Sequence, residues 1–201
     1  MPMWYNALLI GPPLLVAVML HEIAHAVAAL RLGDPSAKSL GRITLNPIRH
    51  IDPFLTILVP AALLISNSPI VFGGAKPVPV NPLHFKDPRR GMLWVAAAGP
   101  GANFILAGLS YVAFIIWQSW FSEAIDLSLW LRILGAWCYY GIFINLVLGI
   151  FNLIPIPPLD GGRIAVGLLP VHWARRLAAV ERYGLVIVIA VVYLMGRMGW
   201  I

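Results

Sequence analysis

Two histidines and a glutamate stand together in the first apolar stretch of the chain, as His21-Glu22-Ile23-Ala24-His25. On an α-helix, side chains at positions i and i+4 lie on one face about a turn apart, which suits two ligands of one zinc ion. The glutamate beside them can reach a water held by that metal. Two histidines buried against backbone carbonyls are the structural alternative, but three ionisable groups inside a membrane helix are costly and usually mark function. The motif therefore indicates metal-assisted hydrolysis.

The composition predicts that this motif lies in a membrane. Hydrophobic residues make up 60% and charged residues 11% of the 201 residues, and the mean hydropathy is +0.85, whereas an ordinary soluble domain is about a quarter charged. We therefore expect a single membrane-embedded domain over residues 1–201. The lone Cys138 excludes an internal disulfide and a cysteine zinc cluster. The net charge of +6 is divided among short loops, which favours an anionic membrane surface over nucleic acid as a partner.

Hydrophobic runs predict an α-helical integral membrane protein of about five to six membrane helices or half-helices. The runs are 4–31, 53–67, 91–120, 131–153 and 181–199, most of them near the roughly 20 residues needed to cross a hydrocarbon core. Between the first two, β-branched residues with Gly and Asn-Pro punctuation predict one or two short strands within 37–47. Prolines at 77, 79 and 82 exclude helix from 73–82 and predict extended chain there.

Loop charges predict the orientation in the membrane. The loops 31–51, 68–90 and 163–182 carry four basic residues each and should face the cytoplasm, whereas 121–130, with Glu123 and Asp126, should lie outside. Two of these basic loops flank 53–67, so we expect that run to enter the protein and 73–80 to return the chain as a small re-entrant β element. Irregular backbone at membrane depth must be buried in protein or line a wet cavity. We expect that cavity to be the metal site, toward the cytoplasmic side of the cell membrane.

A catalytic zinc bound by His21 and His25 needs a third protein ligand, with a fourth position left open for water. Six other ionisable side chains lie inside or near apolar segments: His50, Asp52, His84, His172, Glu181 and Asp160. Helix capping, interfacial placement or pairing with nearby bases, such as Arg176 or Arg182 for Glu181, gives the first five a structural explanation.

Asp160 is the exception among these candidates. It follows Pro155, Pro157 and Pro158, which break a membrane helix and leave a carboxylate at its end. A carboxylate in that setting requires a strong electrostatic partner. Asp160 is therefore the strongest candidate for the third ligand.

Three motifs resemble the site-2 protease family of intramembrane zinc metalloproteases. They are His21-Glu22-Ile23-Ala24-His25, Ala98-Gly99-Pro100-Gly101-Ala102-Asn103 and Asn152…Pro155…Leu159-Asp160-Gly161-Gly162. The segments 41–47 and 76–81 look like those of the minimal bacterial and archaeal members, and the chain carries neither the PDZ nor the CBS modules of some relatives.

The resemblance implies a set of site residues. His21, His25 and Asp160 would bind one zinc ion, Glu22 would be the base that activates water, and Asn152 would bind the substrate carbonyl or its oxyanion. Asn103 has two interpretations, because the small residues around it permit close helix packing as readily as a substrate contact.

These features predict a zinc-dependent intramembrane endopeptidase that cuts within or near the transmembrane segments of membrane proteins. A zinc-binding transporter would also bury His and Asp in the bilayer, but it would favour a second ligand set and leave Glu22 without a purpose. An inactive binder of membrane proteins would not need the intact set of ligands. The expected partners are a transmembrane substrate and the lipid bilayer, and regulation would come from the core itself or from a separate partner.

The segment Lys76-Pro77-Val78-Pro79-Val80 is the predicted substrate-binding strand. A helical substrate must be opened before it is cut, and pairing with an enzyme strand satisfies the backbone groups thereby exposed. The two prolines remove donors from one edge and leave the N–H groups of Lys76, Val78 and Val80 on the other. The alternative is that this edge pairs with a strand at 42–45 while the prolines protect the free edge.

Overall fold

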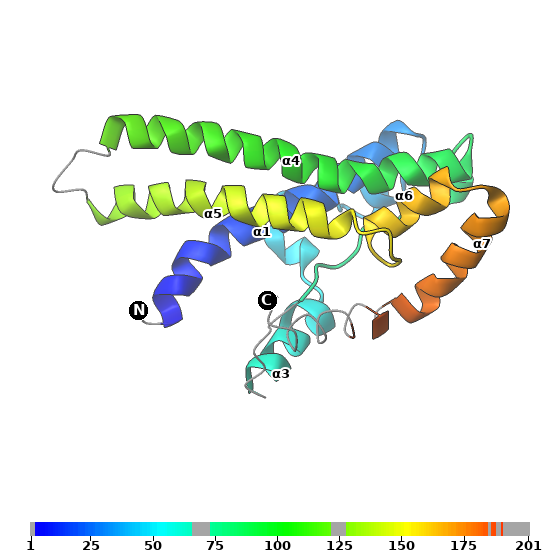
Figure 1. Ribbon diagram of the computed structural model, residues 1–201, viewed down its shortest axis with the longest axis horizontal. Helices are drawn as coiled ribbons and strands as arrows, with labels where there is room; N and C mark the ends of the chain where they lie inside the picture. The colour runs from blue at the N-terminus through cyan, green and yellow to red at the C-terminus, as the bar shows by residue number, and fades with distance from the viewer. Residues whose placement is uncertain (1–2, 66–72, 122–127, 185, 188–189, 191–201) are drawn as a thin grey trace.

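Three long helices form the body of the protein. The computed structural model describes residues 3–65, 73–121, 128–184, 186–187 and 190. In Figure 1, α4 (Pro88–Phe121) and α5 (Leu129–Asn152) run side by side and α1 (Met3–Arg31) lies against them. Each of the three has a stretch long and apolar enough to span a membrane. The chain is therefore a helical membrane protein, and the helices expected at 4–31, 91–120 and 131–153 are confirmed to within a few residues.

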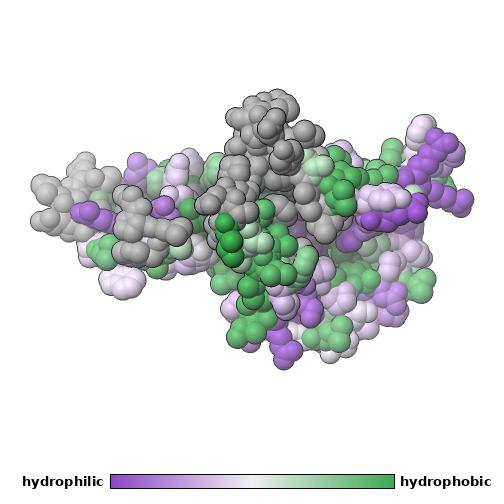
Figure 2. Space-filling model, turned by 90° about the horizontal axis from the view of Figure 1, so that it is seen from below, coloured by the Kyte–Doolittle hydropathy of each residue, from purple (hydrophilic) through white to green (hydrophobic). Residues whose placement is uncertain are grey.

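Contacts among these helices are made mainly through α4, which packs against α1, α5 and α6 (Asp160–Leu168). Two indole nitrogens fasten the helices to one another: Trp137 Nε1 donates to the Leu8 carbonyl at 2.9 Å, and Trp117 Nε1 donates to the Leu131 carbonyl at 2.9 Å. Much of the remaining surface of the helices is apolar and exposed, as a lipid environment requires. In Figure 2 hydrophobic residues cover the middle of the visible face, and the largest hydrophilic group lies at the end that carries α7 (Val171–Val180).

The run 53–67 is helical but short. A π-helical turn, η2 (Pro53–Leu58), leads into α3 (Val59–Ile65), and the pair projects away from the three-helix body (Figure 1). Residues 66–72, 122–127 and most of 181–199 lie outside the described residues, so the expected final membrane helix and the outer loop are not described. A total of five to six membrane helices or half-helices is not confirmed.

The strands expected within 37–47 are not found, and the described residues contain no β-strand. Residues 36–39 form the short helix α2 (Ser36–Ser39), and the chain then turns at Gly41, whose φ is +63°. The 3-10 turn η1 (Pro47–His50) follows, with the Asn46 side chain accepting from the Ile48 N–H at its start. This turn chemistry outweighs the few β-branched residues between 41 and 47. The segment 73–81 is extended but joins no sheet, so the re-entrant β element is not confirmed.

The region expected to be a loop at 163–182 is mostly helical. After α5 ends at Asn152, the chain passes through the prolines at 155, 157 and 158 and begins α6 at Asp160. Helix α7 follows, and the 3-10 turn η4 (Glu181–Tyr183) comes after it. The break between α5 and α6 is the feature that brings Asp160 to the middle of the bundle.

Candidate active site

Residues of one stripe on α1 face the bundle at intervals of four. Ala17, His21, His25 and Ala29 are all buried, and α1 packs against α4. Because the alanines are small, the second helix can approach closely on either side of the two imidazoles. The i, i+4 spacing therefore directs both histidines into the same interior space.

Gly99 on α4 provides the room that these imidazoles occupy. A Cβ atom at this position would lie 2.4 Å from His25 Cε1 and 2.6 Å from His21 Cε1. Gly101, two residues along the same helix, has nothing within 4 Å of the equivalent point. Close approach at the Gly99 position is thus required by the two histidines, whereas Gly101 faces open space.

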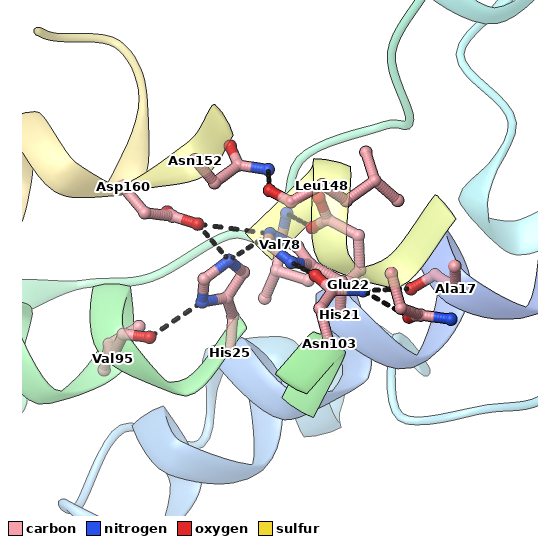
Figure 3. A network of polar contacts seen from close by, with 11 residues as sticks. Ala17, His21, Glu22, His25, Val78, Val95, Asn103, Leu148, Asn152 and Asp160 are labelled. Carbon is pink, nitrogen blue, oxygen red and sulfur yellow. Dashed lines mark hydrogen bonds and ion pairs between the residues drawn. The ribbon is translucent and has the colours of Figure 1, made fainter. Parts of the chain in front are cut away.

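Hydrogen bonds orient the two imidazoles (Figure 3). His21 Nδ1 lies 2.6 Å from Asn103 Oδ1, and His25 Nδ1 lies 2.7 Å from the Val95 carbonyl oxygen. The Asn103 amide nitrogen donates to Asn145 Oδ1 at 2.8 Å, which fixes the oxygen of Asn103 toward His21. Since both partners are acceptors, each Nδ1 carries the hydrogen and each Nε2 keeps its lone pair. Histidines that bind a metal are held in this way by their outer partners.

Asp160, the first residue of α6, completes a cluster of three ligand atoms. Its Oδ2 lies 3.1 Å from His21 Nε2 and 3.3 Å from His25 Nε2, and the two Nε2 atoms are 3.0 Å apart. Two atoms held by a tetrahedral zinc at about 2.0–2.1 Å would be roughly 3.3 Å apart. Asp160 Oδ2 is buried, with no hydrogen-bond partner among the described residues, and lone pairs facing one another at such distances repel unless a cation lies among them. The donor set therefore fits zinc.

Two glycines fix the start of α6. A Cβ atom on Gly161 would lie 2.2 Å from the Leu153 carbonyl oxygen, and one on Gly162 would lie 2.3 Å from the Pro157 nitrogen. The chain between α5 and α6 thus packs directly on the first turn of α6. That contact holds the Asp160 carboxylate toward the two imidazoles.

A cavity of about 280 Å³ opens beside the cluster. Its lining brings together the three ligand residues, Glu22, Asn152 and part of the extended segment, with apolar residues around them: His21, Glu22, His25, Pro77, Val78, Val80, Met92, Val95, Ala96, Asn152, Pro158, Leu159, Asp160 and Arg163. Glu22 Oε2 accepts from the Val78 N–H at 3.1 Å, and Asn152 Nδ2 donates to the Leu148 carbonyl at 3.0 Å. A carboxylate, an amide and a metal-binding cluster thus share one cavity.

Three of the predicted substrate-contact residues, Lys76, Pro79 and Asn103, are not part of this lining. Asn103 is fully buried behind His21. The Lys76 N–H donates to the His50 carbonyl at 2.8 Å. Of the open edge expected at 76, 78 and 80, only the Val80 N–H is without a partner among the described residues. The alternative pairing with a 42–45 strand is not found, since the described chain contains no strand there.

The other candidate ligands have structural partners. His50 Nε2 lies 2.8 Å from the Thr44 carbonyl, Asp52 Oδ1 caps the Phe54 N–H at 2.9 Å, and the His172 ring lies edge-on to Trp173. Glu181 pairs with Arg163 at 2.9 Å, not with Arg176 or Arg182, because α6 brings Arg163 alongside η4. In the part of the chain that is described, His21, His25 and Asp160 are the group whose ligand atoms converge.

Two buried charges that bond to the extended segment were not predicted from the sequence. Asp34 is fully buried and accepts from the Ser36 N–H, the Asn81 N–H and His84 Nδ1. Burial alone would raise the pKa of Asp34, but these hydrogen bonds lower it below its ordinary value. Arg42, one of the four basic residues of the loop 31–51 that were expected to face the cytoplasm, is also buried. In the sequence, only turn residues mark the surroundings of Asp34 and Arg42. Turn residues do not indicate hydrogen bonds to distant parts of the chain.

Comparison with known proteins identifies the family. The profile of peptidase family M50 matches residues 12–195. The chain is 39% identical to "Putative zinc metalloprotease YwhC" of Bacillus subtilis, over 87% of this chain and 75% of that protein. It is 33% identical to "Putative zinc metalloprotease Rip2" of Mycolicibacterium smegmatis, over 87% of this chain and 62% of that protein.

The Rip2 protein of Mycobacterium tuberculosis is 32% identical over 92% of this chain and 67% of its own length. No solved structure matches the chain. The family match covers most of the sequence, including both halves of the converging cluster. The chain belongs to peptidase family M50, the site-2 protease family, and is a zinc-dependent intramembrane metalloendopeptidase.

Proposed function

We propose that His21, His25 and Asp160 bind the catalytic zinc, that Glu22 is the general base, and that Asn152 binds the developing oxyanion. The observation that carries the ligand assignment is the spacing of 3.0–3.3 Å among the three ligand atoms, which matches a tetrahedral site. The buried Asp160 oxygen, which has no hydrogen bond within the described part of the chain, supports it further.

The roles of the other groups follow from their positions around the cavity. Zinc, when bound, polarises the scissile carbonyl and lowers the pKa of water toward neutrality. Glu22 takes the proton from the attacking water and delivers it to the leaving amine. The Val78 N–H keeps the Glu22 carboxylate pointed into the cavity. One N–H of the Asn152 amide is held by the Leu148 carbonyl, which leaves the other for the substrate oxygen.

Substrate recognition is proposed to use Lys76, Pro77, Val78, Pro79 and Val80 as an extended clamp. The Val80 N–H has no partner among the described residues, and Val78 and Val80 line the cavity. An unwound transmembrane segment of a substrate protein could pair with these groups as it enters the site. Asn103 is proposed to orient His21 through its 2.6 Å contact rather than to touch the substrate.

The protein is proposed to lie in the cell membrane with the cavity toward the cytoplasm, as a single domain over residues 1–201. Exposed basic residues on the 31–51, 68–90 and 163–182 segments support this orientation. Cysteines introduced at the exposed positions Ser39, Lys86 and Arg175 should label from the cytoplasmic side once Cys138 is replaced. Label reaching Lys86 from outside would reverse the orientation of that segment and make 53–67 a true crossing.

Two substitutions test the catalytic assignment in detergent, with a transmembrane substrate and with or without chelator. Glu22→Gln keeps the shape of the side chain but cannot accept the proton, so zinc should stay stoichiometric while cleavage falls by orders of magnitude. Asp160→Ala reduces three ligands to two, so zinc itself should be lost. Wild-type turnover in Glu22→Gln would reject the base. Full zinc content in Asp160→Ala would require another third ligand.

A further inference from the structure

The extended segment 76–81 has four backbone N–H groups, at Lys76, Val78, Val80 and Asn81, since positions 77 and 79 are prolines. Three of the four are held by three different parts of the chain. The Lys76 N–H donates to the His50 carbonyl at 2.8 Å, the Val78 N–H to Glu22 at 3.1 Å, and the Asn81 N–H to Asp34 at 2.7 Å. A segment outside any sheet is thus tied down at both ends and in its middle.

Arg42 holds the beginning of this segment through its carbonyls. Its guanidinium donates to the Lys76 carbonyl, lies 3.5 Å from the Pro77 carbonyl and donates to the Arg49 carbonyl at 2.6 Å. The residue is 5% exposed, and it makes no ion pair with a carboxylate in the described chain. A buried guanidinium needs acceptors for its N–H groups. Here Nη1 and Nη2 have carbonyl acceptors, whereas the buried Nε has none among the described residues. The carbonyls of the segment and of Arg49 are therefore the groups that stabilise this buried charge.

Asp34 holds the other end. One carboxylate oxygen accepts from the Asn81 N–H at 2.7 Å, and the other lies 2.7 Å from His84 Nδ1 and accepts from the Ser36 N–H at 3.0 Å. The residue is fully buried. It follows α1 by three residues, across Gly33, whose φ of +108° lets the chain turn sharply. The anchor is thus attached directly to the helix that carries Glu22.

We propose that Arg42 and Asp34 are positioning residues for proteolysis. Together they fix the segment 76–81 relative to α1, so that the Val78 N–H meets the Glu22 carboxylate and Val80 lines the cavity. This inference rests on the proposed roles of Glu22 and of the segment. Neither charge contacts the metal ligands, so both act through backbone geometry alone.

Arg42→Met removes the anchor at the beginning of the segment, and Lys38→Met is the matched control, since it removes one exposed positive charge from the same connection. Hydrogen exchange of a peptide covering 73–82 reports the segment directly. We expect exchange at Lys76 and Val78 to quicken about tenfold or more in Arg42→Met. We expect kcat/KM to fall roughly 10- to 100-fold, because misplacement by about 1 Å is enough for that loss. Zinc content and the spectrum of the cobalt-substituted protein should not change.

Outcomes against the proposal are equally definite. Wild-type exchange or wild-type cleavage in a folded Arg42→Met protein would overturn it, and so would loss of the cobalt spectrum together with activity, which would mean a general structural role. If Arg42→Met does not fold, Arg42→Lys decides, because one ammonium keeps the charge but cannot span the same carbonyls. That variant should fold, show faster exchange and cleave more slowly than wild type, and normal exchange would reject the anchor.

The end anchored by Asp34 is tested by Asp34→Asn. The amide nitrogen of the new side chain must then face an N–H group that now donates to the carboxylate, and that hydrogen bond is lost. Hydrogen exchange should therefore quicken at the Asn81 N–H in particular. Unchanged exchange at Asn81 would overturn this half of the proposal. Failure of the base assignment is seen separately, as cleavage by Glu22→Gln, and it leaves the exchange measurements valid.

Discussion

The two walls of the active-site cavity are built in different ways. One wall consists of α1, α4 and α6, whose side chains reach the site from regular helices and meet where Gly99 leaves room. The opposite wall is the extended segment 73–81, which belongs to no sheet and is held by Arg42 and Asp34. These anchors lie 34 and 47 residues away from their partners in sequence. The helical wall carries the metal ligands and the base Glu22, and the extended wall orients that base through the Val78 N–H and faces the substrate.

This difference predicts which property, zinc binding or turnover, a substitution in each wall should affect. Helices that interlock around small residues hold side chains rigidly, which suits metal ligands that must converge within a few tenths of an ångström. An extended segment leaves backbone donors available, which suits the recognition of an unwound substrate. Changes to the helical wall should therefore release zinc, whereas changes to the extended wall should keep zinc and lower turnover.

The largest effect is expected from Gly99→Ala, which disturbs the helical wall where it is tightest. The added methyl would lie 2.4 Å from the His25 ring and 2.6 Å from the His21 ring, so both imidazoles must move. We expect zinc binding to be lost and cleavage to fall by about 100-fold or more. Gly101→Ala is the control, since nothing lies within 4 Å of its new methyl. Zinc content is measured by elemental analysis. Full zinc content in Gly99→Ala would contradict the prediction and show that the helices can shift to accommodate the methyl without displacing the two imidazoles.

The sequence was sufficient to predict α1, α4 and the three candidate ligands of the helical wall, but not α6, most of which lies in a region expected to be a loop. His21 and His25 lie in an i, i+4 motif, Asp160 follows helix-breaking prolines, and the three long helices have plain apolar runs, so each signal is local. The strands expected at 37–47 were wrong because Pro35, Gly41 and Asn46-Pro47 impose turns. The partners of Asp34 and Arg42 could not be predicted, since a buried charge bonded to distant backbone leaves no periodicity in the sequence.

Two proline substitutions separate the functions of the extended wall. Val78→Pro deletes the donor to Glu22, so kcat should fall about 100-fold with zinc content and melting temperature near wild type. Val80→Pro deletes an N–H that has no partner among the described residues, at a position that lines the cavity. The loss in kcat/KM should be about tenfold and mainly in KM, as expected for an interaction with the bound substrate. Steady-state kinetics on a transmembrane substrate distinguish the two. Unchanged cleavage by a folded Val80→Pro protein would rule out this segment as the clamp.

Asn103→Ala tests the hydrogen bond that orients His21 in the helical wall. Without its oxygen, His21 Nδ1 loses a buried acceptor at 2.6 Å, and removal of such an outer partner costs about 10- to 100-fold in metal affinity. Asn145→Ala is the matched comparison, because Asn145 hydrogen-bonds to Asn103, whereas Asn103 is the residue that hydrogen-bonds to His21. This substitution should weaken zinc binding less. Competition with a chelator measures both affinities. Equal affinities in wild type and Asn103→Ala would remove the positioning role of this residue.

The smallest effect is expected from His84→Ala at the exposed side of the Asp34 anchor. The His84 side chain is 42% exposed, whereas Asp34 is fully buried and keeps the Ser36 and Asn81 donors. Water can take the place of a half-exposed imidazole. The free energy of unfolding should therefore fall by about 1 kcal/mol or less, a shift of roughly 2–4 °C in melting temperature. Cleavage should stay within about twofold of wild type, because the Asn81 N–H remains bonded. A loss of cleavage as large as that of Asp34→Asn would mean that the imidazole, and not the buried carboxylate, carries this end of the extended wall.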